Sequence, residues 1–279
     1  MQRCGNGPQI ESYCPLFIAR HFVRLVLAAA LAITCFLPAA AQDVQKPDIV
    51  RVLEQLHALP GIAEGYRLSG FDDERVAIML DHTRLIMANK GVSSFVADQL
   101  IAAQMGQPNT NQLGGVVQPL IDRGLPHLPL KEQLYFLKVE TTVVRALSKG
   151  SCGQVMKETI NPETFSRENY RIVSRLNTPA LREYLRILRK AAIIGVSRKS
   201  PPRISDRARE TVSDSFFNDV LLRAKAENLM PQLEKSAVSM RALSNKDACR
   251  LGLMFVDTAI EYDGPDKRTL VQLFLLGFE

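Results

Sequence analysis

Apolar residues recur at helical spacing along almost the whole chain after residue 42. The stripe of Ile49, Leu53, Leu56 and Leu59 is typical, because residues three or four apart share one face of a helix. No segment alternates apolar and polar residues for long enough to indicate a strand, and no internal repeat is found. The pattern predicts an all-α protein, an irregular bundle of roughly eight to ten helices.

Four polar residues stand where a helix is expected to begin, and each can cap the backbone N–H groups of a first turn. These are Asp72, Asn161, Thr178 and Ser205. After Ser205 we expect an inward face of Phe217, Val220, Leu221 and Ala224. A long helix is expected to follow Pro129 and to end at Lys149-Gly150.

Residues 106–130 interrupt this pattern with four prolines and four glycines. Such punctuation is typical of loops, although Val116, Val117, Leu120 and Ile121 have the spacing of a short helical turn. The sequence therefore predicts a helical subdomain over residues 42–105, a Pro/Gly-rich connecting loop over 106–130 and a second helical subdomain over 131–279.

The first 41 residues have the three parts of a secretory signal peptide. Arg20 and Arg24 supply positive charge, an apolar run of 13 residues extends from Leu25 to Leu37, and Ala39-Ala40-Ala41 precedes Gln42. The run is shorter than the roughly 20 residues of a membrane-spanning helix. We expect cleavage near Ala41 and a mature protein that is periplasmic or secreted, in a bacterial envelope, with no transmembrane segment.

Three alternatives to a cleaved signal peptide remain open. The segment could act as an uncleaved anchor, although its apolar run is short for that role. It could carry a lipid on Cys35, although Thr34 is bulky for the preceding position. The true start codon could also lie downstream of Met1, because the region before Arg20 is long for a signal peptide.

Cleavage would leave two of the five cysteines, Cys152 and Cys249. An even pair in an oxidising compartment predicts one disulfide. The alternative is two free buried thiols. Neither cysteine has a second Cys or a His at ligand spacing, so no metal site is predicted there.

Positive charge is concentrated between Arg167 and Arg209, where 12 basic residues face only three acidic ones. Six arginines in this window stand three or four residues apart on two predicted helices: Arg167, Arg171, Arg175, Arg182, Arg186 and Arg189. Like charges at this spacing destabilise an isolated helix, and the planar guanidinium suits carboxylate and phosphate. These six are the candidate residues for binding an anion or a partner.

The same arginines also have a structural interpretation, because a run of charge is usually a solvated helix face. The acidic residues Asp257, Glu261, Asp263 and Asp266 could lie beside the basic helices and neutralise them. Nucleic acid is not expected as a partner, because aromatic residues do not alternate with the basic ones.

The sequence contains no recognisable catalytic, metal or cofactor motif. His57, His82 and His127 are not at zinc-helix spacing, and the nucleophile and phosphate-loop motifs are missing. We therefore predict no catalytic residue, metal or cofactor. The leading hypothesis is an exported helical protein that binds an acidic partner or an anionic envelope component. The alternative is a periplasmic hydrolase with a site built from scattered carboxylates or histidines.

Overall fold

The structure is a computed structural model, and it describes residues 45–104, 116–198, 200–264 and 266–277. The predicted signal peptide, residues 1–41, lies outside the described residues. The all-α prediction is confirmed, because the described residues form 13 α-helices and no strand. The number exceeds the expected range of about eight to ten. The long helix predicted to follow Pro129 ends at Ala146, and a further helix that was not predicted, Lys149–Met156, begins where the long one was expected to end.

The α-helices, with three short 3-10 helices, have the following bounds: α2 (Lys46–Glu54), η2 (Leu56–Ala58), α3 (Pro60–Leu68), α4 (Asp73–Met87), α5 (Lys90–Gln104), α6 (Gln118–Gly124), η4 (Leu125–His127), α7 (Leu130–Ala146), α8 (Lys149–Met156), α9 (Pro162–Val173), α10 (Thr178–Ser197), α11 (Asp206–Ala226), α12 (Met230–Val238), η5 (Met240–Ala242), α13 (Asn245–Glu261) and α14 (Lys267–Leu276).

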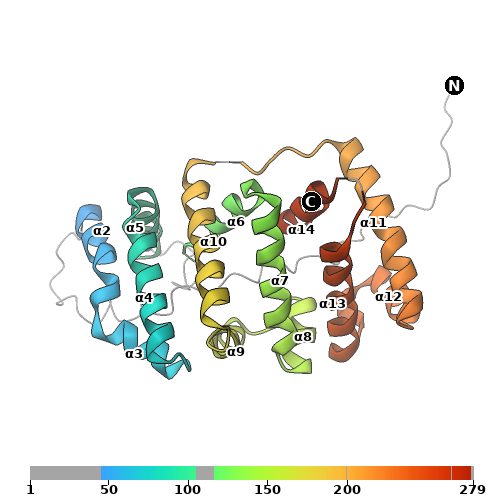
Figure 1. Ribbon diagram of the computed structural model, residues 1–279, viewed down its shortest axis with the longest axis horizontal. Helices are drawn as coiled ribbons and strands as arrows, with labels where there is room; N and C mark the ends of the chain where they lie inside the picture. Colours follow the sequence, from blue (N-terminus) through green and yellow to red (C-terminus); the bar gives the residue numbers. More distant parts are fainter. Residues whose placement is uncertain (1–44, 105–115, 199, 265, 278–279) are drawn as a thin grey trace.

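The helices form a row, with α2–α5 at one end, α7 and α10 in the middle, and α11–α14 at the other end (Figure 1). Helix α10 packs against α4, α5, α6, α7 and η4. Helix α13 packs against α7, α8, α11, α12 and α14. The buried apolar side chains of both regions belong to one continuous hydrophobic cluster.

Local capping chemistry explains several helix starts. The side chains of Asp72, Asn161 and Ser205 each accept a backbone N–H from the first turn that follows, as the sequence predicts. Helix α10 differs by one residue, because Asn177 and not Thr178 is the cap and accepts the N–H of Ala180.

The described part of the predicted loop over residues 106–130 is mostly helical. Residues 105–115 lie outside the description, but residues 118–127 form α6 and η4. The prolines stand at helix starts, where a missing N–H has no cost: Pro119 in the first turn of α6 and Pro129 at the N-cap of α7. The proline content of this region therefore indicates short helices as well as loops, and the division into two subdomains stays a prediction.

Helices α6 and α10 cross at two glycines. A Cβ atom on Gly124 would lie 1.8 Å from the carbonyl oxygen of Ala191, and one on Gly195 would lie 1.9 Å from that of Leu120. Each helix thus brings its backbone against the other at the position of a glycine. Only a residue without a side chain fits at either position.

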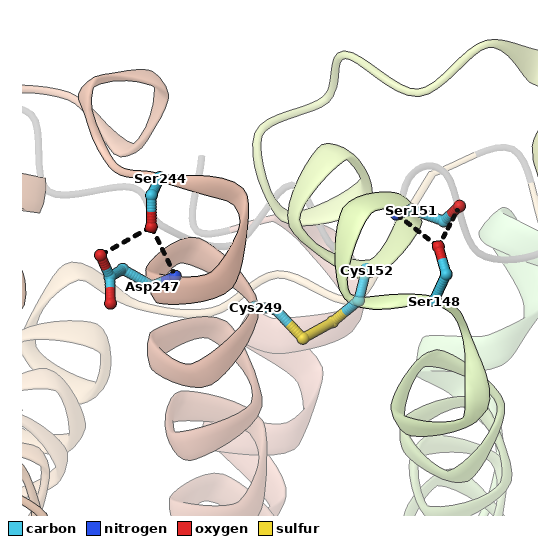
Figure 2. Close-up of a disulfide and its surroundings, with 6 residues drawn as sticks. All are labelled: Ser148, Ser151, Cys152, Ser244, Asp247 and Cys249. Carbon is cyan, nitrogen blue, oxygen red and sulfur yellow. Dashed lines mark hydrogen bonds between the residues drawn. A yellow bond between two sulfur atoms is a disulfide. The ribbon is translucent and has the colours of Figure 1, made fainter.

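Helices α8 and α13 meet at the predicted disulfide (Figure 2). Cys152 and Cys249 are joined, with their Cα atoms 5.3 Å apart. Ser148 caps α8 and Ser244 caps α13, so both cysteines lie near the start of a capped helix. Gly153, the next residue after Cys152, permits this approach, because its Cβ would lie 2.1 Å from the carbonyl oxygen of Asn245.

Candidate functional site

The six predicted arginines lie on two consecutive helices and on the turn between them. Arg167 and Arg171 belong to α9, and Arg175 lies in the turn that follows. Helix α9 is strongly amphipathic: Phe165 and Ile172 are buried, whereas Arg167, Arg171 and Arg175 are exposed. The apolar face that anchors the helix therefore leaves its arginines in solvent.

Helix α10 carries the other three arginines on its outer side. Arg182 is exposed, and Arg186 and Arg189 are partly buried. Their spacing of three and four residues places them above one another on the helix surface. The opposite face of α10 is buried and includes Leu181, Leu188 and Ala192.

Five of these six guanidinium groups form no ion pair with a carboxylate of the described residues: those of Arg167, Arg171, Arg175, Arg182 and Arg189. Two of the three acidic residues of the same helices are engaged elsewhere, and the third, Glu163, is exposed in the first turn of α9 and forms no ion pair with a described residue. Glu168 accepts a hydrogen bond from the Ser151 hydroxyl, and Glu183 pairs with Arg186. Neither Glu168 nor Glu183 is therefore paired with one of the five arginines.

Arg186 has a different environment from the other five. Its Nη2 lies 2.8 Å from Glu132 Oε1, and its Nε lies 2.7 Å from Glu183 Oε2. Lys190 completes the cluster, with its Nζ 2.8 Å from Glu132 Oε2. Burial alone would raise the pKa of Glu132, but hydrogen bonds from Lys190 and Arg186 hold it below the ordinary value. The donors of Arg186 thus join α7 to α10 and are not available as a free anion site.

Arg189 also faces inward in part. Its positive charge acts on His82 of α4, whose imidazole is buried against α10. Burial first, and the charge of Arg189 second, lower the pKa of His82 to about 4. His82 is therefore neutral at physiological pH.

The arginines that remain exposed and without a carboxylate partner among the described residues are Arg167, Arg171, Arg175 and Arg182, here called the α9–α10 arginines. They come from consecutive segments of the chain and contribute four positive charges to its surface. Helices and turns fix their backbone positions, while the long side chains stay free to adapt to a ligand.

Two of the four acidic residues proposed as internal counter-charges, Asp257 and Glu261, pair with other arginines. Asp257 binds Arg145 of α7, with Nη2 2.7 Å from Oδ1. Glu261 binds Arg223 of α11, with Nη1 2.8 Å from Oε2. These contacts join α7 and α11 to α13, and they do not involve α9. The structural interpretation of Asp257 and Glu261 as partners of the basic helices is therefore wrong.

A buried carboxyl group between α7 and α10 was not found by the sequence reasoning. Glu140 is fully buried, and its Oε1 accepts a hydrogen bond from the Tyr184 hydroxyl. Its Oε2 has no partner among the described residues. Burial raises the pKa of Glu140 to about 8 and also raises that of Tyr184. The available signal was an acidic residue on the apolar face that includes Phe136 and Val144.

The hydrolase alternative depends on carboxylates or histidines that the fold brings together. The carboxyl group of Glu140 faces a tyrosine hydroxyl and not a second carboxyl. His57, His82 and His127 lie on η2, α4 and η4, and His127 contacts the Ser200 carbonyl. No group of three or more His, Cys, Asp or Glu side chains in the described ranges could hold a metal ion.

A search of the described helices for a membrane-spanning segment gave none of sufficient length and apolarity. In comparisons with known proteins, no family model, no curated protein and no solved structure matched the chain. The functional argument therefore rests on the geometry of the chain itself, and its leading candidate is the group of α9–α10 arginines.

Proposed function

We propose that the protein is an exported helical binding protein that recognises an acidic protein or an anionic component of the bacterial envelope. The α9–α10 arginines form the contact surface. One observation carries the proposal: Arg167, Arg171, Arg175 and Arg182 are exposed and have no carboxylate partner among the described residues.

The contrast with other arginines of the chain supports this role. Arg145, Arg186 and Arg223 all bind carboxylates that lie far away in the sequence. The fold thus supplies acids to arginines on α7, α10 and α11 but not to the exposed arginines around α9. Repulsion between like charges four residues apart costs a few tenths of a kcal/mol for each pair, and an anionic ligand would remove that cost.

The chemistry of arginine defines the ligand class. A guanidinium group presents several N–H donors in one plane and binds carboxylate or phosphate through two parallel hydrogen bonds. Acidic side chains and phosphate head groups offer such acceptors. Export, for which the support is the pattern of residues 1–41, would place the surface among these groups.

The test compares binding of the wild-type chain and a charge-reversed variant to two defined probes. The variant carries Arg167→Glu, Arg171→Glu, Arg175→Glu and Arg182→Glu. The probes are vesicles that contain phosphatidylglycerol and, as a model of an acidic protein, polyglutamate. Each basic residue near an anionic surface contributes about 1 kcal/mol, so we expect binding to fall by on the order of 100-fold or more.

A matched control separates a local effect from one of net charge. Lys138→Glu, Lys225→Glu, Lys235→Glu and Lys246→Glu change the charge equally at exposed positions of α7, α11, α12 and α13. The control should keep most of the wild-type binding, and high salt should weaken binding of the wild type. Equal losses in the two variants would mean that the α9–α10 arginines form no specific surface. Circular dichroism confirms that both variants remain helical.

A further inference from the structure

The connection between α10 and α11 crosses from the middle of the helix row to its far end (Figure 1). Helix α10 ends at Ser197, and α11 begins at Asp206 with Ser205 as its cap. Residues 200–205 of this connection are here called the strap. They contain two consecutive prolines followed by Arg203, Ile204 and Ser205.

The strap has the local structure that proteases require. No backbone hydrogen bond joins residues 201–204 to any other described residue, and Arg203 and Ser205 are exposed. Pro201 and Pro202 fix their own φ angles, and each favours an extended residue before it. Exposed, extended segments of polar residues are preferred sites of cleavage, because a protease can bind them without first unfolding a helix.

The side chains of the strap also select a class of protease. Arg203 places a guanidinium group in solvent, and trypsin-like enzymes bind such a group through a carboxylate in their specificity pocket. The residue after Arg203 is Ile204, so the peptide bond on its carboxyl side is not one to proline. By contrast, residues 105–115 contain no lysine or arginine and offer this class of enzyme no bond to cleave.

The disulfide spans the strap. Cys152 precedes it and Cys249 follows it, and the bond between them joins α8 to α13. Helices α13 and α14 also pack against α7, so non-covalent contacts cross the same boundary. A cut in the strap would therefore give two chains that stay connected.

We propose that the Arg203–Ile204 bond is a processing site for an arginine-specific, trypsin-like protease, and that the two-chain product remains folded. In the reaction, water adds across the peptide bond between the Arg203 carbonyl carbon and the Ile204 nitrogen. The bond breaks to leave a carboxylate on Arg203 and a new amino terminus on Ile204. The Cys152–Cys249 disulfide then holds the fragments together. This inference is independent of the proposed anion binding.

The test is brief trypsin treatment of the oxidised full-length chain, followed by gels and amino-terminal sequencing. Among all bonds on the carboxyl-terminal side of residue Lys46, we expect trypsin to cut the Arg203–Ile204 bond first. The new fragment then begins Ile-Ser-Asp, from Ile204 to Asp206. The two fragments should separate on a reducing gel and migrate together on a non-reducing one. If the earliest cut in this region falls at any other bond, including the one on the carboxyl side of Arg198, the proposal is overturned.

Two variants test the bond itself. Arg203→Gln should slow the first cut at least tenfold. The matched control is Arg207→Gln, which removes an exposed arginine from the first turn of α11. This control should be cut after Arg203 at the wild-type rate. Equal rates of the first cut in Arg203→Gln and in wild type would contradict the assignment.

Thermal unfolding tests whether the two-chain product is folded. The oxidised product should unfold cooperatively, at a midpoint that does not depend on protein concentration. After reduction the fragments are separate molecules, so their midpoint should rise with concentration, while that of the reduced intact chain should not. Loss of cooperative unfolding directly after the cut, with the disulfide intact, would show that the two-chain form does not hold its fold.

Discussion

The α6–α10 and α8–α13 crossings both bring helix backbones together at a glycine, but the two crossings are held in different ways. Gly124 and Gly195 let the backbones of α6 and α10 touch, and Gly153 does the same for α8 against the start of α13. Helices α6 and α8 have only seven and eight residues, too few to be stable alone. Helix α8 is tied by a disulfide, whereas α6 depends on its fit against α10.

The comparison teaches that close packing and covalent linkage are alternative ways to keep a short helix in place. The α6–α10 crossing has two reciprocal glycines against backbone atoms, and neither position can give way. At the α8–α13 crossing, Gly252 faces the flexible side chain of Met156, so that contact can adjust. Gly153 at this crossing also meets backbone atoms, so the covalent bond stands at the crossing where one of the two glycine contacts can adjust.

The largest expected effect comes from removing the covalent link. The double variant Cys152→Ser, Cys249→Ser opens a loop with a sequence separation of 97 residues. The chain-entropy argument gives a loss of about 4 to 5 kcal/mol in the free energy of unfolding for such a loop. Denaturant titration measures the loss, and reduced wild type serves as the control. An unchanged midpoint would mean that packing alone holds α8.

The next effect comes from filling the α6–α10 crossing. Gly195→Ala would place its Cβ 1.9 Å from the backbone oxygen of Leu120, so the helices must move apart. We expect the free energy of unfolding to fall by about 3 kcal/mol, at the upper end of the cost of overpacking. Gly252→Ala should cost only about 1 kcal/mol, because the side chain of Met156 can shift.

Gly65→Ala is the control for helix propensity. Gly65 lies inside α3, and a Cβ there would have no neighbour within 4 Å. Alanine should therefore stabilise the protein by about 0.5 to 1 kcal/mol. If Gly195→Ala costs no more than Gly252→Ala in the same denaturant titration, the backbones of α6 and α10 are not as close as described.

A further expected effect depends on pH and concerns the contact between α7 and α10. Glu140 binds Tyr184 of α10, and its pKa of about 8 exceeds the ordinary 4.5. Between these values the folded state holds a proton that the unfolded state releases, so stability falls as pH rises. Glu140→Gln should remove this fall, with a gain of a few kcal/mol over wild type above about pH 8.

The measurement is the difference in the free energy of unfolding between wild type and Glu140→Gln, from about pH 4 to about pH 9. His82 acts in the opposite direction, because its lowered pKa makes stability fall as pH drops below 6.5 towards 4. It is present in both proteins and cancels in the difference. A difference that does not vary with pH would show that Glu140 does not carry its proton in the fold.

The parts of the fold that depend on neighbouring residues could be predicted from the sequence. The caps at Asp72, Asn161 and Ser205 act within a few residues, and the helical periodicity is equally local. Helix α11 shows where periodicity fails. Paired apolar residues define two possible faces, and the structure buries Phe216 while Leu221, predicted to face inward, is 46 % exposed.

The candidate site could be predicted only in part. The sequence located the charged helices, but it could not pair Arg186 with Glu132, which is 54 residues away. It also assigned Asp257 to the wrong partners, because Arg145 is 112 residues from it. Ion pairs across such separations depend on helix packing, which the periodicity of one helix does not determine. The buried Glu140 could have been found from the apolar face of α7, but its partner Tyr184, 44 residues away, could not.

The position of α10 also sets an order of assembly. The helices α4, α5, α6 and α7 that pack against it all precede it along the chain. Because synthesis proceeds from the amino terminus, these contacts can form as soon as Ser197 has emerged, before α11–α14 exist. The disulfide of Cys152 can form only after Cys249 has been synthesised. The first half of the molecule can therefore serve as the template on which the second half folds, and oxidation completes the process.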